Sequence, residues 1–244
     1  MTAALAQRLD RGLRDLLPPS VRVAKRAIQS WRRGEPELHL LPRLCSRDRW
    51  SVDVGANTGV YSWHMARWSA GVTAFEPQPA LARMLERAFG GRVAVERVAL
   101  SDTPGEAVLR VPVDRHQDGR ATIEPQNDLA RLTVRELVVP RRRLDSYRLP
   151  PIGLIKIDVE GHELAVLSGA SGILRRDRPS LIIEAEDRHR PGAFDSIRDY
   201  LRGFGYRPHV CRGGGLVPVE AWGVGAMAGV NFVFLAEGRD GAGG

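Results

Sequence analysis

The sequence predicts an α/β fold with a mostly parallel sheet and helices on both faces. An apolar segment, residues 50–52, runs directly into the glycine turn Asp53-Val54-Gly55-Ala56-Asn57-Thr58-Gly59. A second apolar run, residues 72–75, ends at Glu76, and strand-like and helix-like segments then alternate to about residue 235. A strand, a glycine turn, a helix, a strand and an acid, in that order, open a nucleotide-type βαβ unit.

Seven strands and four helices account for the regular part of this pattern. We expect strands at residues 50–54, 72–75, 93–100, 154–158, 181–184, 206–211 and 232–235, and helices at residues 59–68, 79–89, 164–174 and 194–204. Pro79 and Gly90 support the second helix, because proline fits a first helical turn and glycine fits a helix end. The last two strands should form the antiparallel pair that closes the sheet.

The alternation is interrupted between the third and fourth strands. Residues 107–113 and 137–143 alternate in polarity like extended strands, and a polar stretch, residues 114–135, separates them. This insertion predicts a β-hairpin or loop near the mouth of the ligand pocket. A glycine-rich connection at residues 212–230 should shape the same pocket.

The chain divides into a helical leader at residues 1–42, a catalytic domain at residues 43–238 and a disordered tail at residues 239–244. Leucines recur at helical spacing up to Pro18-Pro19, and Ser20 is then expected to cap a basic helix over residues 21–31. The leader is either a lid or brace packed on the catalytic domain, or an attachment to an anionic membrane or acidic partner. Aspartates among the arginines, and Trp31 as a packing residue, favour the lid.

Charge, hydrophobicity and cysteine content indicate the cellular compartment of the protein and limit its binding partners. The formal net charge of +7 comes mainly from arginine, but no aromatic residues are interleaved as a base-stacking platform needs, so no nucleic-acid partner is expected. No apolar run is long enough to cross a bilayer, and the N-terminus lacks the apolar core of a secretory signal. Cys45 and Cys211 have no metal-type spacing, so we expect reduced thiols in a cytoplasmic protein. The oligomeric state is not indicated.

The glycine turn indicates the kind of cofactor. Dinucleotide sites use G-x-G-x-x-G, whereas the glycines here read G-x-x-x-G, without the middle glycine that lets a pyrophosphate approach. This looser turn suits a smaller adenosine cofactor with an amino-acid tail, namely S-adenosylmethionine. Glu76, at the end of the second strand, is placed to hold both hydroxyls of a ribose. The competing interpretation is a glycine that serves only the turn after the first strand.

A second motif narrows the class. Residues 152–163 run from an apolar strand into Lys156-Ile157-Asp158-Val159-Glu160-Gly161-His162-Glu163. Together with the glycine turn, Phe75-Glu76-Pro77 and Ala99-Leu100-Ser101-Asp102, this motif makes residues 50–235 resemble the FkbM family of methyltransferases. The resemblance implies a class I methyltransferase (Rossmann-like) fold, S-adenosylmethionine as the donor, and an oxygen acceptor on a sugar, polyketide or lipid.

Ligands of an open α/β sheet bind at the carboxyl ends of its strands, so the residues there are the candidate cofactor contacts. They are Asp53, Gly55, Ala56, Asn57, Gly59, Glu76, Ser101, Asp102 and Asp158. The first turn should hold the methionine part, with Asp53 facing its ammonium group and backbone amides facing its carboxylate. Asp102 should accept a hydrogen bond from the adenine amine, although it can equally be a turn-forming residue.

Methylation of an alcohol needs a base that removes the acceptor proton. The candidate bases are Asp158, Glu160, His162 and Glu184. Histidine has the best matched ordinary pKa, but the Asp-x-Glu-Gly unit is the strongest mark of the resembled family, so Asp158 and Glu160 are preferred. Asp158 and Glu184 could also share Mg²⁺, but no Asp-Asn pair follows the fifth strand, and no metal is expected.

Three other functions compete with this one. The missing G-x-G-x-x-G argues against an NAD-dependent oxidoreductase. The complete set of acids at the strand ends argues against a non-catalytic cofactor-binding scaffold attached through the basic leader. An amino-directed nucleic-acid methylase often carries an Asn/Asp-Pro-Pro-aromatic turn where this chain has Asp158-Val159-Glu160-Gly161. The expected acceptor is therefore a small molecule or glycolipid, which the sequence does not name.

Overall fold

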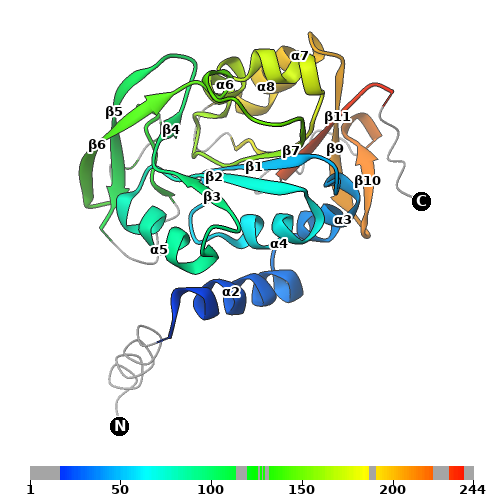
Figure 1. Ribbon diagram of the computed structural model, residues 1–244. Coiled ribbons are helices and arrows are strands. Elements are labelled where there is room, and N and C mark those ends of the chain that lie inside the picture. Colours follow the sequence, from blue (N-terminus) through cyan, green and yellow to red (C-terminus); the bar gives the residue numbers. More distant parts are fainter. Residues whose placement is uncertain are drawn as a thin grey trace.

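The computed structural model describes residues 17–113, 120–125, 127, 129, 132–186, 191–221 and 231–238. An eight-stranded sheet forms its centre, with helices on both faces (Figure 1). In order across the sheet the strands are β10 (Gly215–Pro218), β9 (Tyr206–Arg212), β11 (Asn231–Ala236), β8 (Ser180–Glu184), β7 (Ile152–Ile157), β1 (Trp50–Val54), β2 (Gly71–Phe75) and β3 (Ala94–Glu96).

The pairing confirms a mostly parallel sheet with an antiparallel closing pair. β1 is parallel to β2 and β7, and β7 is parallel to β8, whereas β11 is antiparallel to both β8 and β9. The predicted count of seven strands is wrong by one, because β10 pairs with β9. The two strands are joined by Gly213 and Gly214, whose φ angles of 55° and 78° suit a two-residue hairpin turn.

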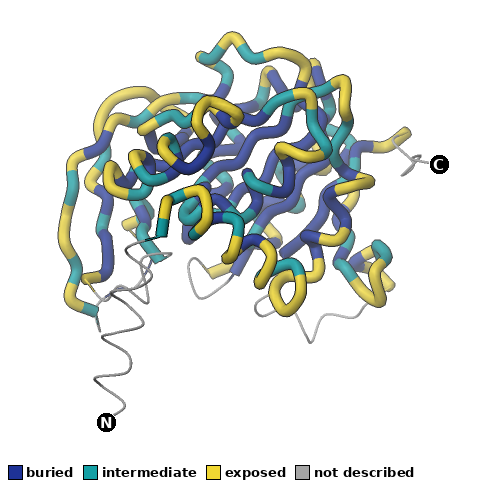
Figure 2. The backbone as a smooth tube through the Cα atoms, turned by 60° about the horizontal axis from the view of Figure 1, so that its bottom comes forward, coloured by how far each residue is buried: buried dark blue, intermediate teal, exposed yellow. Residues whose placement is uncertain are grey.

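Two helical layers bury the two faces of the sheet. On one side lie α4 (Val60–Trp68), α5 (Pro79–Phe89), α2 (Pro19–Arg33), α3 (Leu41–Leu44) and the short helix η1 (Pro36–Leu40); on the other lie α6 (Glu163–Ser168), α7 (Ser171–Asp177) and α8 (Ala193–Arg202) (Figure 1). The central strands are consequently buried (Figure 2), and all six residues of β7 are buried. Such strands read as nearly continuous apolar runs, as the sequence of β7 does.

The third predicted strand is two strands in the structure, so that expectation is wrong. β3 stays in the main sheet, while β4 (Ala99–Leu100) joins a second sheet with β6 (Val134–Arg142) and β5 (Gly105–Pro112). The chain leaves the main sheet after Glu96 because β4 hydrogen-bonds to β6 instead. β5 and β6 form the predicted antiparallel hairpin, with Gly105 opposite Arg141 and Pro112 opposite Val134.

Two helix boundaries also differ from the prediction. The helix expected at residues 164–174 is interrupted at Gly169, where a Cβ would lie 2.0 Å from the carbonyl oxygen of Ser101. Ser20 does not cap α2, because Pro19 already occupies the first helical turn and Pro18 precedes it. Proline is favoured at that position because its missing N–H has no partner there in any case.

The described part of the leader packs against the catalytic helices. Val23 and Ala27 of α2 are buried, and Leu38 and Leu41 are fully buried. Val23, Leu38 and Leu41 belong to the apolar cluster that contains Met65 of α4. These contacts support the lid or brace, and the division of the chain at residue 42 stays a prediction. The first leader helix and the tail were expected at residues outside the described ranges.

Two further observations concern the whole of the described chain. Cys45 and Cys211 are free and form no disulfide. None of the helices among the described residues combines the length and apolar character needed to cross a bilayer.

Candidate cofactor and active site

The glycine turn brings the carboxyl ends of two neighbouring strands into contact. Gly55 follows β1 with a φ of 78°, and a Cβ there would lie 1.9 Å from the carbonyl oxygen of Asp158, just after β7. Gly59 precedes α4 with a φ of 80°, and a Cβ there would lie 2.7 Å from Leu85. Both glycines of the G-x-x-x-G turn are therefore favoured by conformation, and Gly55 is also required by space because its neighbour is a backbone atom.

Glu76 is the central polar group of the turn. It is buried, and the backbone N–H groups of Asn57 and Gln78 donate to its two carboxylate oxygens at 2.7 and 2.9 Å. Burial raises the pKa of Glu76 to about 7, although these two donors act in the opposite direction. The two hydrogen bonds fix the carboxylate in one orientation at the end of β2.

Three further N–H groups of the turn are engaged within the protein. Gly55 and Ala56 donate to the carbonyl oxygen of Phe75 at 2.9 and 3.1 Å, and Gly59 donates to Ala56 at 2.8 Å. The amides of Gly55, Ala56 and Gly59 are therefore occupied by the turn itself and by β2, and binding of a methionine carboxylate by the amides of this loop stays a prediction. What the turn presents to a ligand is the carboxylate of Glu76.

A cavity opens beside Glu76 at the carboxyl ends of β1, β2 and β7. Its apolar wall includes Phe75, Val98, Leu100, Leu109 and Ile123, and its polar groups include Asn57, Glu76, Gln78, Asp158 and His162. Apolar walls with a few convergent polar groups are typical of cofactor sites. Of the predicted cofactor contacts, Gly55, Asn57, Glu76 and Asp158 are brought together here.

Asp53 lies behind the turn rather than in the cavity. It is buried on β1 and accepts a hydrogen bond of 2.5 Å from the hydroxyl of Ser62 on α4. Burial raises its pKa to about 6. This side chain therefore ties β1 to α4, and the structure does not bring it to the ligand.

Ser101 and Asp102 do not line the cavity formed by the described residues either. Asp102 is exposed and accepts hydrogen bonds from the hydroxyls of Ser101 and Thr103 at 3.0 and 3.3 Å. Burial acts to raise the pKa of Asp102, but these hydrogen bonds outweigh it and the pKa is lowered. The geometry matches the turn-forming alternative for Asp102.

His162 lines the cavity but has both ring nitrogens engaged. Nε2 lies 2.9 Å from the hydroxyl of Ser101, and Nδ1 lies 3.1 Å from a carboxylate oxygen of Glu124. The ring thus connects the end of β4, the helix start after β7 and the segment that follows the hairpin strand β5. This arrangement fits a bridging residue better than the proton acceptor that the sequence left open.

The three predicted acidic bases form one cluster. Asp158, Glu160 and Glu184 each place a carboxylate oxygen within 4.8 Å of the other two. Burial raises the pKa of Glu184 well above its ordinary value, and the neighbouring charge of Asp158 raises it further. A side-chain hydrogen bond between Glu184 and Asp158 acts in the same direction, so this environment favours the protonated form of Glu184. Hard carboxylate ligands at this spacing could instead hold a divalent cation.

Comparison with known proteins decides the family. Residues 53–208 match the methyltransferase FkbM domain. The chain belongs to the FkbM methyltransferase family. Hexuronic acid methyltransferase AglP of Haloferax volcanii is 31% identical over 148 residues, which cover 59% of this chain and 59% of that protein. This chain therefore spans less than two thirds of that relative's length.

A solved structure shows the same fold. The FkbM methyltransferase of Methylobacillus flagellatus superimposes with a TM-score of 0.53 at 18% identity, covering 92% of this chain and 57% of that one. At this identity the likeness concerns the fold alone. The predicted class I methyltransferase fold is confirmed, with eight strands in the main sheet where seven were predicted.

The FkbM signature also contains a buried cation whose setting the sequence did not reveal. Lys156 is 1% exposed, its Nζ lies 3.3 Å from Asp158 Oδ2, and it lies over the ring of Tyr61, 4.9 Å from the centroid. The hydroxyl of Tyr61 donates a hydrogen bond to Glu35 in the leader. Glu35 also accepts a hydrogen bond of 3.0 Å from the side-chain amide of Asn231. This chain of contacts joins the leader to Asp158. The alternation of Lys156 with apolar residues was its only signal in the sequence.

The FkbM turn after β7 is held from both sides by residues that the sequence did not single out. Glu160 has a φ of 57°, which is rare outside glycine. Its carbonyl oxygen accepts hydrogen bonds from Thr122 at 2.9 Å and Asn127 at 2.7 Å. Glu163 accepts from the backbone of Gly161 at 2.9 Å, and burial raises its pKa to about 7. These contacts fix the backbone of the turn that carries Asp158 and Glu160.

Proposed function

We propose that this chain is an S-adenosylmethionine-dependent methyltransferase that methylates a hydroxyl oxygen of a sugar-type small molecule or glycan. The observation that carries the proposal is the buried carboxylate of Glu76, held by two backbone donors at the end of β2. A carboxylate in this position accepts hydrogen bonds from both hydroxyls of a ribose. Membership of a methyltransferase family selects an adenosine methyl donor over a nicotinamide cofactor.

The lining of the cavity has the chemistry that the adenosine half of that donor needs, but its volume of about 40 Å³ requires the site to open before the adenosine can enter. Phe75, Leu100 and Ile123 offer an apolar surface for the flat base. Asn57 and Gln78 hold Glu76 toward the ribose position, and a Cβ at Gly55 would push the turn away from Asp158. When bound, the donor supplies a methyl group on a positively charged sulfur, an electrophile that needs no further activation.

The residues of the chain then have two tasks, to orient the acceptor and to accept its proton. Asp158 lines the cavity, and its ion pair with Lys156 favours the charged carboxylate. The raised pKa of Glu184 favours its protonated form, and Glu184 hydrogen-bonds to Asp158. Asp158 is therefore the group best prepared to take the hydroxyl proton as the new C–O bond forms.

The relative AglP is named for a hexuronic acid, which supports a sugar-type acceptor. A carboxylate acceptor is already deprotonated and needs no base, whereas a hydroxyl does. The two kinds of acceptor oxygen therefore differ in how much they depend on Asp158.

The experiment measures transfer of a labelled methyl group from S-adenosylmethionine to a panel of hexoses, hexuronic acids, polyketides and glycolipids. We expect incorporation into a sugar hydroxyl that falls steeply in Asp158→Asn. Incorporation that is unchanged in this variant would place the methyl on an oxygen that needs no base. Absence of transfer to every sugar, together with transfer to a polyketide, would reject the sugar-type acceptor.

A further inference from the structure

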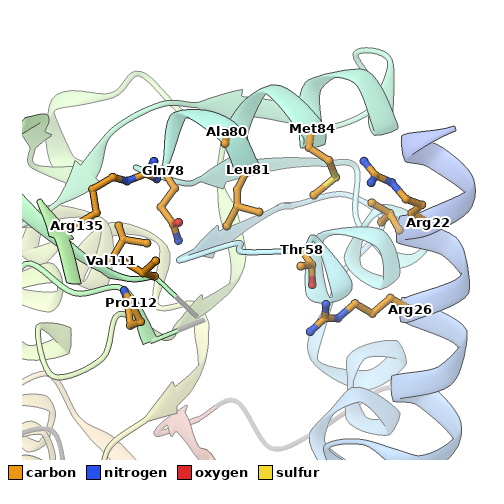
Figure 3. A pocket seen from close by; sticks show the side chains of 12 residues that line it. Arg22, Arg26, Thr58, Gln78, Ala80, Leu81, Met84, Val111, Pro112 and Arg135 are labelled. Carbon is orange, nitrogen blue, oxygen red and sulfur yellow. The ribbon is translucent and has the colours of Figure 1, made fainter. Parts of the chain in front are cut away.

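A second, larger cavity adjoins the cofactor cavity. It has a volume of about 630 Å³ and lies between α2, α5 and the tip of the β5–β6 hairpin (Figure 3). Gln78 lines both cavities, and Thr58 in the second directly follows Asn57 in the first. A molecule bound in the second cavity therefore lies next to Glu76 and the position of the donor's ribose.

All charged side chains among the described residues that line this cavity are positive. Arg22 and Arg26 reach it from α2 and Arg135 reaches it from β6, while none of the described residues that line it is acidic. Arg26 and Arg135 form no ion pair with any residue in the described part of the chain. The arginines of α2 are one turn apart, and the buried side chains of Val23 and Ala27 anchor that helix.

The other lining groups suit a polar molecule with an apolar face. Leu81 and Met84 of α5 and Val111 of β5 provide aliphatic surface. Figure 3 shows the polar side chain of Gln78 on the side of Arg135, and that of Thr58 on the side of Arg26. The volume falls within the roughly 300–1,000 Å³ that small-molecule sites occupy. A sugar ring with its hydroxyls and C–H faces has this mixed character.

We infer that this cavity is the acceptor site and that it selects an acidic glycan, whose carboxylate or phosphate binds the arginines. Guanidinium groups bind both anions through paired hydrogen bonds. This inference rests on the proposed function and adds to it the charge of the acceptor and the residues that read it. It also gives the leader a defined task, because two of the three arginines belong to α2.

The test uses the full chain and three probes: a glucuronic acid-containing disaccharide, its neutral glucose counterpart, and glucose 1-phosphate. Binding is measured by calorimetry in the presence of S-adenosylhomocysteine, so the result does not depend on turnover. We expect a Kd for at least one acidic probe that is tenfold or more below that of the neutral disaccharide. Comparing the two acidic probes shows whether the anion is a carboxylate or a phosphate.

The variants are Arg26→Gln combined with Arg135→Gln, and Arg32→Gln as the matched control. Arg32 is an exposed arginine of the same helix that does not line the cavity. We expect the double variant to raise the Kd for the acidic probe tenfold or more, to leave the neutral probe unchanged, and to keep the affinity for S-adenosylhomocysteine within twofold. The control should match the unmodified chain.

Two outcomes would overturn the inference. One is an unchanged affinity for the acidic probes in the double variant. The other is a loss of affinity for S-adenosylhomocysteine in that variant, which would assign the arginines to the carboxylate of the cofactor. Failure of the unmodified chain to bind S-adenosylhomocysteine would instead reject the proposed function, so the two failures are distinguishable.

Discussion

Substitution of Gly55 by alanine is expected to damage stability and donor binding together. A side chain at this position would lie 1.9 Å from the backbone oxygen of Asp158, and neither atom belongs to a flexible side chain. The turn after β1 would have to move away from the end of β7. That movement would separate Asn57, which donates to Glu76, from Asp158 of the acidic cluster.

The size of the effect follows from two contributions. Alanine at a φ of 78° costs about 1–2 kcal/mol, and an enforced overlap in a packed region adds about 1–3 kcal/mol. The total of about 2–5 kcal/mol corresponds to a fall in Tm of roughly 4–20 °C for a chain of this size. Gly90→Ala is the matched control, because its φ is also positive but a Cβ there meets nothing within 4 Å.

The assay is thermal unfolding of both variants, with and without S-adenosylhomocysteine. We expect Gly90→Ala to lose only about 1–2 kcal/mol of stability, which is the conformational part alone, and to keep its stabilisation by the ligand. Gly55→Ala should lose more stability, and S-adenosylhomocysteine should stabilise this variant only slightly. Equal losses in the two variants would refute the contact between the first turn and Asp158.

Three further predictions concern separate parts of the molecule. Burial raises the pKa of Glu163 from 4.5 to about 7. The folded protein therefore binds this proton more tightly than the unfolded chain does. The stability that this group contributes is consequently lost as the pH rises from about 4.5 through 7. Glu163→Gln should therefore remove part of this decline, roughly 3 kcal/mol at most, in denaturant titrations at pH 5 and pH 9; an unchanged slope with pH would contradict the burial of a titrating carboxyl. Asp158→Asn and Glu160→Gln preserve shape and remove a charge, and at least one should lower turnover by about two orders of magnitude at unchanged donor affinity, measured by single-turnover methyl transfer. Near-normal turnover in both would move the base to Glu184 or to His189, which lies outside the described residues. Finally, the basic helix α2 should bind anionic vesicles only if the leader is a membrane attachment. If the leader is a lid, sedimentation with such vesicles at low salt should show no binding. Salt-sensitive binding that is abolished by Arg32→Gln combined with Arg33→Gln would favour the attachment.

The sequence predicts those parts of the molecule in which a local pattern decides the structure. α5 runs from Pro79 to Phe89 as predicted, because a proline at its start and a glycine at its end both act within one turn of the helix. β1, the glycine turn and Glu76 were predicted for a similar reason. Their apolar runs and glycines have no equally good alternative conformation.

Long-range partners explain the rest. Residues 93–100 are compatible with one strand, and only the distant β6 draws Ala99 and Leu100 into a second sheet. The bridge from His162 to Ser101 and Glu124 likewise joins segments 61 and 38 residues apart. The predicted role of Asp53 also depended on a distant residue, because Ser62 on the next helix turns its carboxylate away from the cavity. No local pattern encodes such contacts.

The most direct test of the central claim is a calorimetric titration of the chain with S-adenosylhomocysteine and, separately, with NAD. We predict micromolar-scale binding of S-adenosylhomocysteine and none of NAD. Glu76→Ala removes the acceptor of two hydrogen bonds to a charged group, each worth about 1.5–3 kcal/mol, so it should weaken binding at least a hundredfold. Glu86→Ala, at an exposed carboxylate on α5, should bind normally. Binding of NAD without S-adenosylhomocysteine, or full affinity in Glu76→Ala, would contradict the assignment of this cavity to a methyl donor.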